Sequence, residues 1–209
     1  MGAAVGQIAE CGGRGQSLRV RGGGTKFEWG TPAAEPDAIV STAELDRIVE
    51  HNEGDLTAIL EAGVPLARAQ EEFERAGQML ALDPPLGESD AATIGGVVAT
   101  GDSGPLRHRY GAPRDLVLGM TVALSDGTVA KSGSKVIKNV AGYDLAKLFT
   151  GSFGTLGLIA TVSVRLHSAP PVTATAHGAS DDPDRLAAAA IALGRRPLES
   201  DCLDVAWAA

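Results

Sequence analysis

The segment that most constrains this chain is RGGGTK, residues 21–26, which follows a short apolar stretch at 18–20. Three consecutive glycines carry no Cβ atoms, so a ligand can lie directly against the backbone. Successive N–H groups in such a turn can converge on an anion, and Arg21 and Lys26 add positive charge on either side. The segment therefore predicts a phosphate or diphosphate site, and with it a nucleotide cofactor. The alternative for this motif alone is a flexible glycine turn between strands.

Several other site motifs are missing from the sequence. No GxGxxG follows a predicted strand and no Gly-Lys dipeptide occurs, which excludes the Rossmann fingerprint and the Walker A loop. No GxSxG segment supports a serine hydrolase. The histidines lack metal-ligand spacing, and Cys11 and Cys202 lie at opposite ends of the chain. We therefore predict no metal site and no disulfide framework.

Composition excludes further classes of function. The net charge of −8, from 18 basic and 26 acidic residues, disfavours general nucleic-acid binding. Aromatic residues make up 4% of the chain, too few for a platform that stacks single-stranded nucleic acid. No apolar run is long enough to span a bilayer, and the N-terminus lacks the features of a signal peptide. We expect a cytoplasmic chain.

Glycines gather in three clusters, 22–24, 95–104 and 151–157, which indicates a long ligand contacted by backbone at several points. The segment 93–100 is expected to form a short helix whose N-terminal amides are available to an anion. The hydrophobic pattern predicts further helices at 3–11, 65–76 and 144–149, strands at 18–21, 38–41, 56–61, 116–124 and 156–166, and a hairpin turn at 125–128 leading to a strand at 129–131.

The composition changes after Pro170 and Pro171. Beyond them the sequence predicts a strand at 172–176, a helix at 181–194 and a strand at 203–207. A strand–helix–strand unit cannot bury both faces of a sheet by itself. We therefore expect residues 1–169 to form one α+β domain and residues 170–209 to begin a truncated C-terminal cap domain.

Two basic groups have two interpretations. Arg107, His108, Arg109 and Arg114 form one, and Lys131, Lys135 and Lys138 form the other. They are either solvated loop charges or groups that neutralise a diphosphate or an anionic substrate.

These segments together resemble a known family. RGGGTK (21–26), EAGVPL (61–66), a proline-rich step at 83–85, TIGGVVATGDSGPLRHRYGAPRDLVLG (93–119) and KNVAGYDLAKLFTGSFGTLGLI (138–159) occur in the order found in the vanillyl-alcohol-oxidase, or PCMH-type, FAD-binding domain of 2-hydroxy-acid dehydrogenases. The resemblance covers most of residues 16–168. It favours the FAD-binding E subunit of glycolate oxidase, because Gly101 stands where the D-type subunits usually have Asn. It implies two small α/β subdomains that hold FAD between them.

The resemblance also implies a role for each residue of the site. The amides of Gly22, Gly23, Gly24, Thr25 and Lys26 would hold the diphosphate; Thr93, Gly95, Gly96 and Ala99 would line the ribityl and flavin side; Gly104 and Tyr110 would lie near the isoalloxazine; and Gly154, Gly157 and Ile159 would lie by the diphosphate and the adenine. Some relatives attach flavin through a histidine in the first glycine loop. Thr25 and Lys26 occupy that region here, so we expect non-covalent FAD.

The function implied by the resemblance is oxidation of glycolate to glyoxylate with electrons passed to FAD. The implied partners are other glycolate oxidase subunits, a catalytic flavoprotein and an iron–sulfur subunit, which would hold the chain peripherally at the inner membrane. One alternative is a flavin-carrying electron-relay or assembly subunit without its own substrate site. Others are an NADPH-dependent enolpyruvyl-sugar reductase, which the KNVAGYDL segment disfavours, and a fragment that binds nothing. No catalytic residue is assigned, because the family holds the substrate carboxylate mainly in the cap domain.

Overall fold

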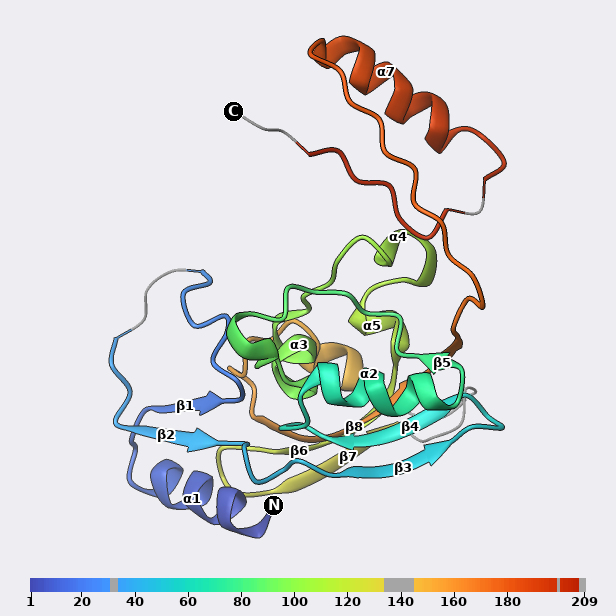
Figure 1. Cartoon of the computed structure of the whole chain (residues 1–209). Helices are drawn as coiled ribbons and strands as arrows, with labels where there is room; N and C mark the ends of the chain where they lie inside the picture. The colour runs from blue at the N-terminus through green and yellow to red at the C-terminus, as the bar shows by residue number, and fades with distance from the viewer. Residues whose placement is uncertain (31–33, 134–144, 199, 207–209) are drawn as a thin grey trace.

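The computed structural model describes residues 1–30, 34–133, 145–198 and 200–206. Its centre is a five-stranded sheet with strand order β3-β4-β8-β6-β7, in which every neighbouring pair is antiparallel (Figure 1). Val162 and Val164 of the central strand are buried while Thr161 and Ser163 are half-buried, so the strand alternates as a sheet with one core face should. The strands are β3 (Ile48–Asn52), β4 (Thr57–Glu61), β6 (Val117–Ala123), β7 (Val129–Gly133) and β8 (Leu158–Arg165).

Short helices cover one face of this sheet (Figure 1). The longest, α2 (Leu66–Arg75), buries Leu66, Ala69 and Phe73 on a single face and ends before Gly77, whose φ of +66° terminates the helix. The others are α3 (Ile94–Thr100), α4 (Arg107–Tyr110), α5 (Pro113–Leu116), α6 (Leu145–Phe149) and the 3₁₀ turn η1 (Glu88–Asp90). A two-residue pair, β5 (Gln78–Met79) with β9 (His167–Ser168), closes the far end.

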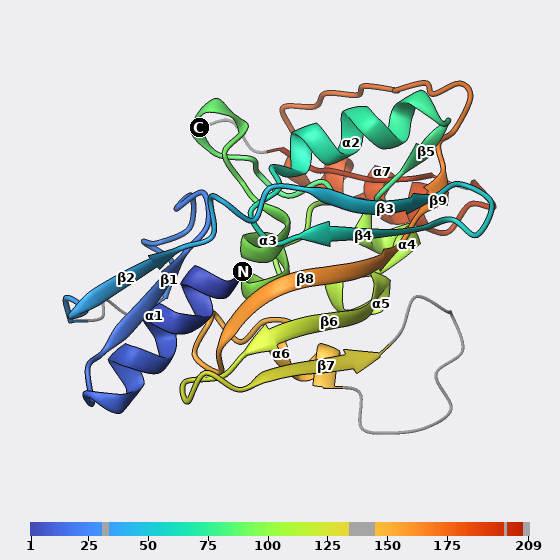
Figure 2. The same cartoon turned by 90° about the horizontal axis from the view of Figure 1, so that it is seen from below.

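A smaller unit lies at one end of the sheet (Figure 2). It contains α1 (Gly2–Gly13) and a parallel pair of strands, β1 (Leu18–Arg21) and β2 (Ala38–Ser41). Its hydrophobic cluster joins Ile8 and Val40 to Leu158 and Ala160 of the large sheet. The first glycine loop therefore leaves β1 at the junction of the two units.

Most of the elements expected from the sequence are confirmed, including the helix at 65–76, the hairpin at 125–128 and the strand at 156–166. The edge strand β3 was not predicted, because its sequence IVEHN is polar over its second half. The strand expected at 172–176 is wrong: the segment has no strand partner, and Val172 is 83% exposed. Residues 203–206 are also irregular rather than a strand.

Some expectations fall outside the described residues. They are the expected helix start at Asp144, the adjacent Tyr143, the end of the predicted strand at 207, and the basic groups Lys135 and Lys138.

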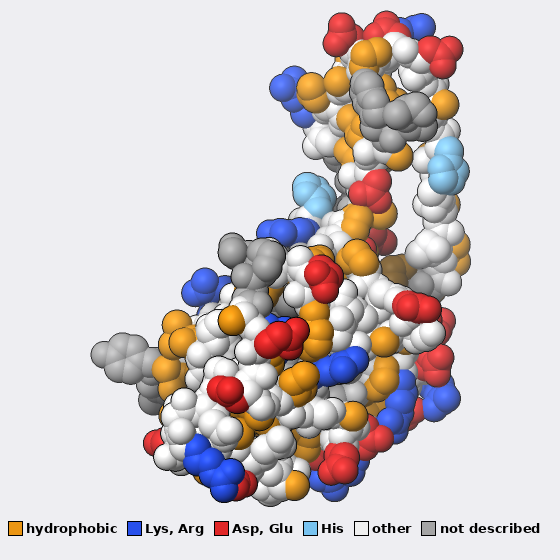
Figure 3. All heavy atoms as spheres, turned by 90° about the vertical axis from the view of Figure 1, so that its left-hand side faces the viewer, with side chains coloured by type: hydrophobic (Ala, Val, Ile, Leu, Met, Phe, Trp, Pro, Cys, Tyr) orange, Lys and Arg blue, Asp and Glu red, His pale blue; other side chains and the backbone are white. Residues whose placement is uncertain are grey.

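The C-terminal segment extends away from the body as an arm (Figure 3), which carries α7 (Pro183–Gly194) and then turns back (Figure 1). Asp182 caps α7 by accepting from the amides of Asp184 and Arg185. No residue of α7 is buried. On its return the arm contacts the body at Asp201, whose carboxylate lies 3.0 Å from Arg109 Nη1 and accepts a hydrogen bond from the Tyr110 hydroxyl at 3.1 Å. Across the described ranges, no helix has the length and apolar character needed to cross a membrane.

Candidate functional site

A cavity of about 600 Å³ lies where the small unit meets the large sheet. Its walls come from β1 and the first glycine loop, from α3, and from the turn that leads into β8. All but two of the residues expected at the cofactor line it: Gly22, Gly23, Gly24, Thr25, Lys26, Thr93, Gly95, Gly96, Ala99, Gly154, Gly157 and Ile159. The structure thus gathers the three glycine clusters around one space.

Gly104 and Tyr110 do not line this cavity. Gly104 packs against Asp83, whose carbonyl oxygen would lie 2.1 Å from an added Cβ. The Tyr110 ring meets His167 edge-to-face at 4.9 Å between centroids. Burial, and then the hydrogen bond to Asp201, raise the pKa of the Tyr110 hydroxyl. The position of Gly104 and Tyr110 near the isoalloxazine stays a prediction.

The first glycine loop presents a row of backbone amides to the cavity. The β1–β2 ladder ends where the Thr42 amide donates to the Arg21 carbonyl at 2.9 Å. Within the described ranges, the amides of residues 22–26 donate to no protein acceptor. Buried or half-buried amides without acceptors are costly unless a ligand or solvent accepts from them. The loop therefore fits the diphosphate of FAD, which offers several acceptor oxygens.

The two cations expected to flank this loop are arranged differently from the prediction. Lys26 Nζ lies 3.1 Å from Asp102 Oδ2 in an ion contact with both side chains less than 10% exposed. The same ammonium donates to the Pro85 carbonyl at 3.0 Å. Arg21 does not line the cavity, and its guanidinium lies over the Phe27 ring at 5.6 Å. Arg19 lines the cavity together with Lys26, and sequence reasoning missed Arg19 because it lies inside β1.

The expectation that α3 offers free N-terminal amides is wrong. The Ile94 and Gly95 amides donate to the carbonyls of Val64 and Ala62, at 2.9 and 2.8 Å. The Gly96 amide donates to Oγ1 of Thr93, the N-cap of the helix. These amides are therefore consumed by the junction between the end of β4 and the helix, and α3 contributes shape rather than anion-binding donors.

Three aromatic side chains at the cavity were not predicted. Phe27 and Trp29 come from the first glycine loop and Phe153 from the turn before β8. Their position beside the first and third glycine clusters is a signal that the sequence did contain. The cavity wall therefore combines apolar surface with a few polar groups, as sites for flat organic cofactors do.

Other candidate groups do not assemble into a site. In the described part of the chain, no three His, Cys, Asp or Glu side chains could hold a metal ion. Burial, and then the charge of Arg165, lower the pKa of His167. Of the basic residues at 107–114, Arg109 is paired with Asp201, so this group has at least one structural partner.

Comparison with known proteins decides the family. A family described as "FAD binding domain" matches residues 5–133. The chain belongs to this FAD-binding family, and FAD is its cofactor. The chain is 41% identical over 124 residues to glycolate oxidase subunit GlcE of Escherichia coli, an alignment that covers 59% of this chain and 35% of that protein. It is 38% identical over 149 residues to the mitochondrial D-lactate dehydrogenase (cytochrome) of Arabidopsis thaliana, covering 71% of this chain and 26% of that one.

A solved structure agrees on the fold. Alkyldihydroxyacetonephosphate synthase superimposes with a TM-score of 0.68 at 19% identity, over 81% of this chain and 30% of that chain. The expected α+β, PCMH-type FAD-binding fold is therefore confirmed. This FAD-binding chain spans about a quarter to a third of the length of the relatives it matches.

Proposed function

We propose that this chain is the FAD-binding part of a 2-hydroxy-acid oxidoreductase and that its substrate is glycolate. The observation that carries the proposal is the row of amides at residues 22–26, which have no acceptor among the described residues and line an apolar cavity. Such a cradle suits a dinucleotide with a diphosphate at its centre. The similarity to a glycolate oxidase subunit favours glycolate, and the similarity to a D-lactate dehydrogenase supports the wider class of 2-hydroxy acids.

The protein groups would bind and orient rather than react. The amides at 22–26 would donate hydrogen bonds to the diphosphate. The absence of a side chain at Gly95 lets α3 pack against Ala62, directly after β4. When bound, FAD supplies the hydride acceptor for oxidation of a 2-hydroxy acid to a 2-oxo acid. We propose non-covalent binding, since the first glycine loop contains no histidine.

The rest of the assembly follows from the same proposal. Residues 1–169 would be the cofactor domain and residues 170–209 the beginning of a cap. The catalytic flavoprotein and iron–sulfur subunits of a glycolate oxidase would be the partners, and they would account for any peripheral attachment to the inner membrane. The similarity to GlcE, which is named as a subunit, also favours a second candidate: a flavin-carrying relay or assembly subunit without its own substrate site.

An anaerobic titration separates these possibilities. The FAD-loaded chain is mixed with glycolate or D-lactate, and the visible flavin bands are followed. Bleaching by glycolate in preference to D-lactate is the expected result. Bleaching by D-lactate alone would refute glycolate as the substrate. Bands that persist with both acids, but bleach when the partner subunits are added, would replace the proposal with the relay function.

A further inference from the structure

Three aromatic side chains are exposed around the cofactor cavity. Phe27, Trp29 and Phe153 all line it, and they are 41%, 46% and 53% exposed. The chain has only four Phe and two Trp, and the other two phenylalanines, Phe73 and Phe149, are buried in the core. In a chain so poor in aromatic residues, this placement indicates a binding surface rather than chance exposure.

Phe153 is held in a strained conformation. Its φ is +54°, in the left-handed region that disfavours every residue with a bulky Cβ. Its amide donates to the Ala99 carbonyl at 2.8 Å, which fixes the turn against α3. A phenyl ring that is half exposed recovers little of this strain through packing. Strain without compensation in the free protein is typical of positions that serve a ligand.

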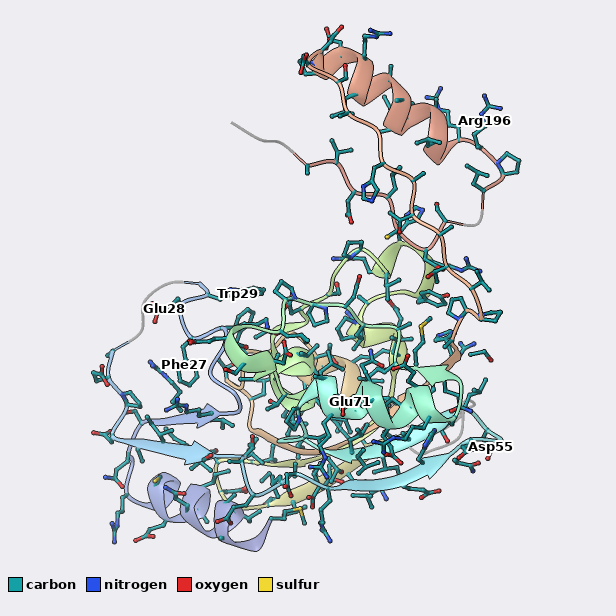
Figure 4. All side chains as sticks on the ribbon, viewed as in Figure 1. Phe27, Glu28, Trp29, Asp55, Glu71 and Arg196 are labelled. Carbon is teal, nitrogen blue, oxygen red and sulfur yellow. The ribbon has the colours of Figure 1, made fainter. Side chains whose placement is uncertain are left out.

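The other two rings already have cationic neighbours. Phe27 has two guanidinium neighbours: the Cζ atoms of Arg19 and Arg21 lie 5.8 and 5.6 Å from its ring centroid. Lys26 Nζ lies 5.6 Å from the Trp29 ring. Figure 4 shows Phe27 beside β1 and Trp29 directed from the loop toward the body of the molecule. Among the described residues Phe153 has no ring or cation contact, so no aromatic or cationic partner of the protein occupies its ring.

We propose that Phe153 stacks on a planar ring of FAD. The proposal rests on FAD as the cofactor of the proposed function. The turn that carries Phe153 is bonded to Ala99 of α3, and the neighbouring Gly154 faces Val20 of β1. Phe153 therefore lies where two walls of the cavity meet, and the binding of ADP and of FMN identifies the ring that it contacts.

The decisive variant is Phe153→Gly, made in the 209-residue chain. Glycine accepts a φ of +54° without strain, so the apo protein should unfold at the same temperature as the wild type or a higher one. Loss of the stacked ring should nevertheless weaken FAD binding about ten-fold, a typical loss of affinity for a base stacked on an aromatic side chain. Only one half of the cofactor should show this loss: ADP binding weakens about ten-fold if the stacked ring is adenine, and FMN binding weakens about ten-fold if it is the isoalloxazine.

Two controls accompany this variant. Leu156→Ala removes a side chain of the same turn that is 44% exposed and does not line the cavity, so FAD affinity should stay unchanged. Phe153→Trp keeps a ring of larger area and should retain wild-type affinity. The readout is quenching of flavin fluorescence on binding, with ADP measured by competition.

The outcomes separate this inference from the proposed function. FAD affinity that is unchanged in Phe153→Gly would overturn the stacking role. Equal losses for ADP and FMN would show a general disturbance of the cavity and would also overturn stacking on one ring. A wild-type chain that binds no FAD would instead refute the proposed function itself.

Discussion

A buried ion contact between Lys26 and Asp102 ties the first glycine loop to the turn that follows α3. The two side chains are 8% and 7% exposed, and Nζ lies 3.1 Å from Oδ2. Asp102→Asn keeps the shape of the side chain and removes its charge. The Lys26 ammonium is then left buried with two neutral acceptors, the Pro85 carbonyl at 3.0 Å and Thr25 Oγ1 at 3.4 Å.

The expected loss of stability follows from this geometry. Removing one partner of a buried ion pair costs about 3–5 kcal/mol, because the remaining charge stays desolvated. The two neutral acceptors place Asp102→Asn near the lower limit, at about 3 kcal/mol in the free energy of unfolding. For a chain of this length that corresponds to a fall of roughly 6–12 °C in the unfolding temperature.

Urea unfolding of the apo protein measures this loss. The double variant Lys26→Met with Asp102→Leu should recover most of it, since apolar replacement of both partners removes the buried charge. Asp46→Asn is the matched control: Asp46 faces Arg68 at 3.7 Å, but both side chains are more than half exposed, so little change is expected. This reasoning would be refuted if Asp102→Asn and Asp46→Asn had the same stability. It would also be refuted if the double variant were as unstable as Asp102→Asn alone.

Two further predictions concern the loop and the sheet. Gly23→Ala would place a Cβ 1.7 Å from the Ala91 carbonyl oxygen, so the loop must shift and FAD affinity should fall about ten-fold or more. Gly6→Ala is the control, because an added Cβ there has nothing within 4 Å and should leave FAD affinity unchanged. Equal FAD affinities of the two variants in a fluorescence titration would contradict this prediction. Hydrogen bonds from Arg47 hold the pKa of Glu61 below its usual range, so its stabilisation is present above the unfolded pKa and disappears as pH falls through the lower folded value. Glu61→Gln should therefore have a lower free energy of unfolding than the wild type at about pH 7, and this difference should be smaller at about pH 3. A difference in the free energy of unfolding that does not change with pH would be evidence against the pair.

The sequence predicted what depends on local chemistry. Glycine spacing located the loops that meet at the cavity, and apolar spacing located α2 and β8. It could not predict the partners of the Ile94 and Gly95 amides, because those carbonyls lie about thirty residues away along the chain at the end of β4. Asp102, the partner of Lys26, is still more remote in sequence.

The strand expected at 172–176 failed for a related reason. Val172 and its neighbours have the composition of a strand, but a strand also needs a partner edge, and the arm carries none among the described residues. Phe153 is a different case, since its exposure and its positive φ become visible only in three dimensions.

The central claim is that the amides of residues 22–26 hold the diphosphate of FAD. Hydrogen exchange of the 209-residue chain, with and without FAD, tests it directly. We expect FAD to slow exchange in peptides that contain residues 22–26 and to leave α7 unchanged, since no residue of α7 lines the cavity. Bound FAD that leaves exchange at 22–26 unaltered would contradict the claim.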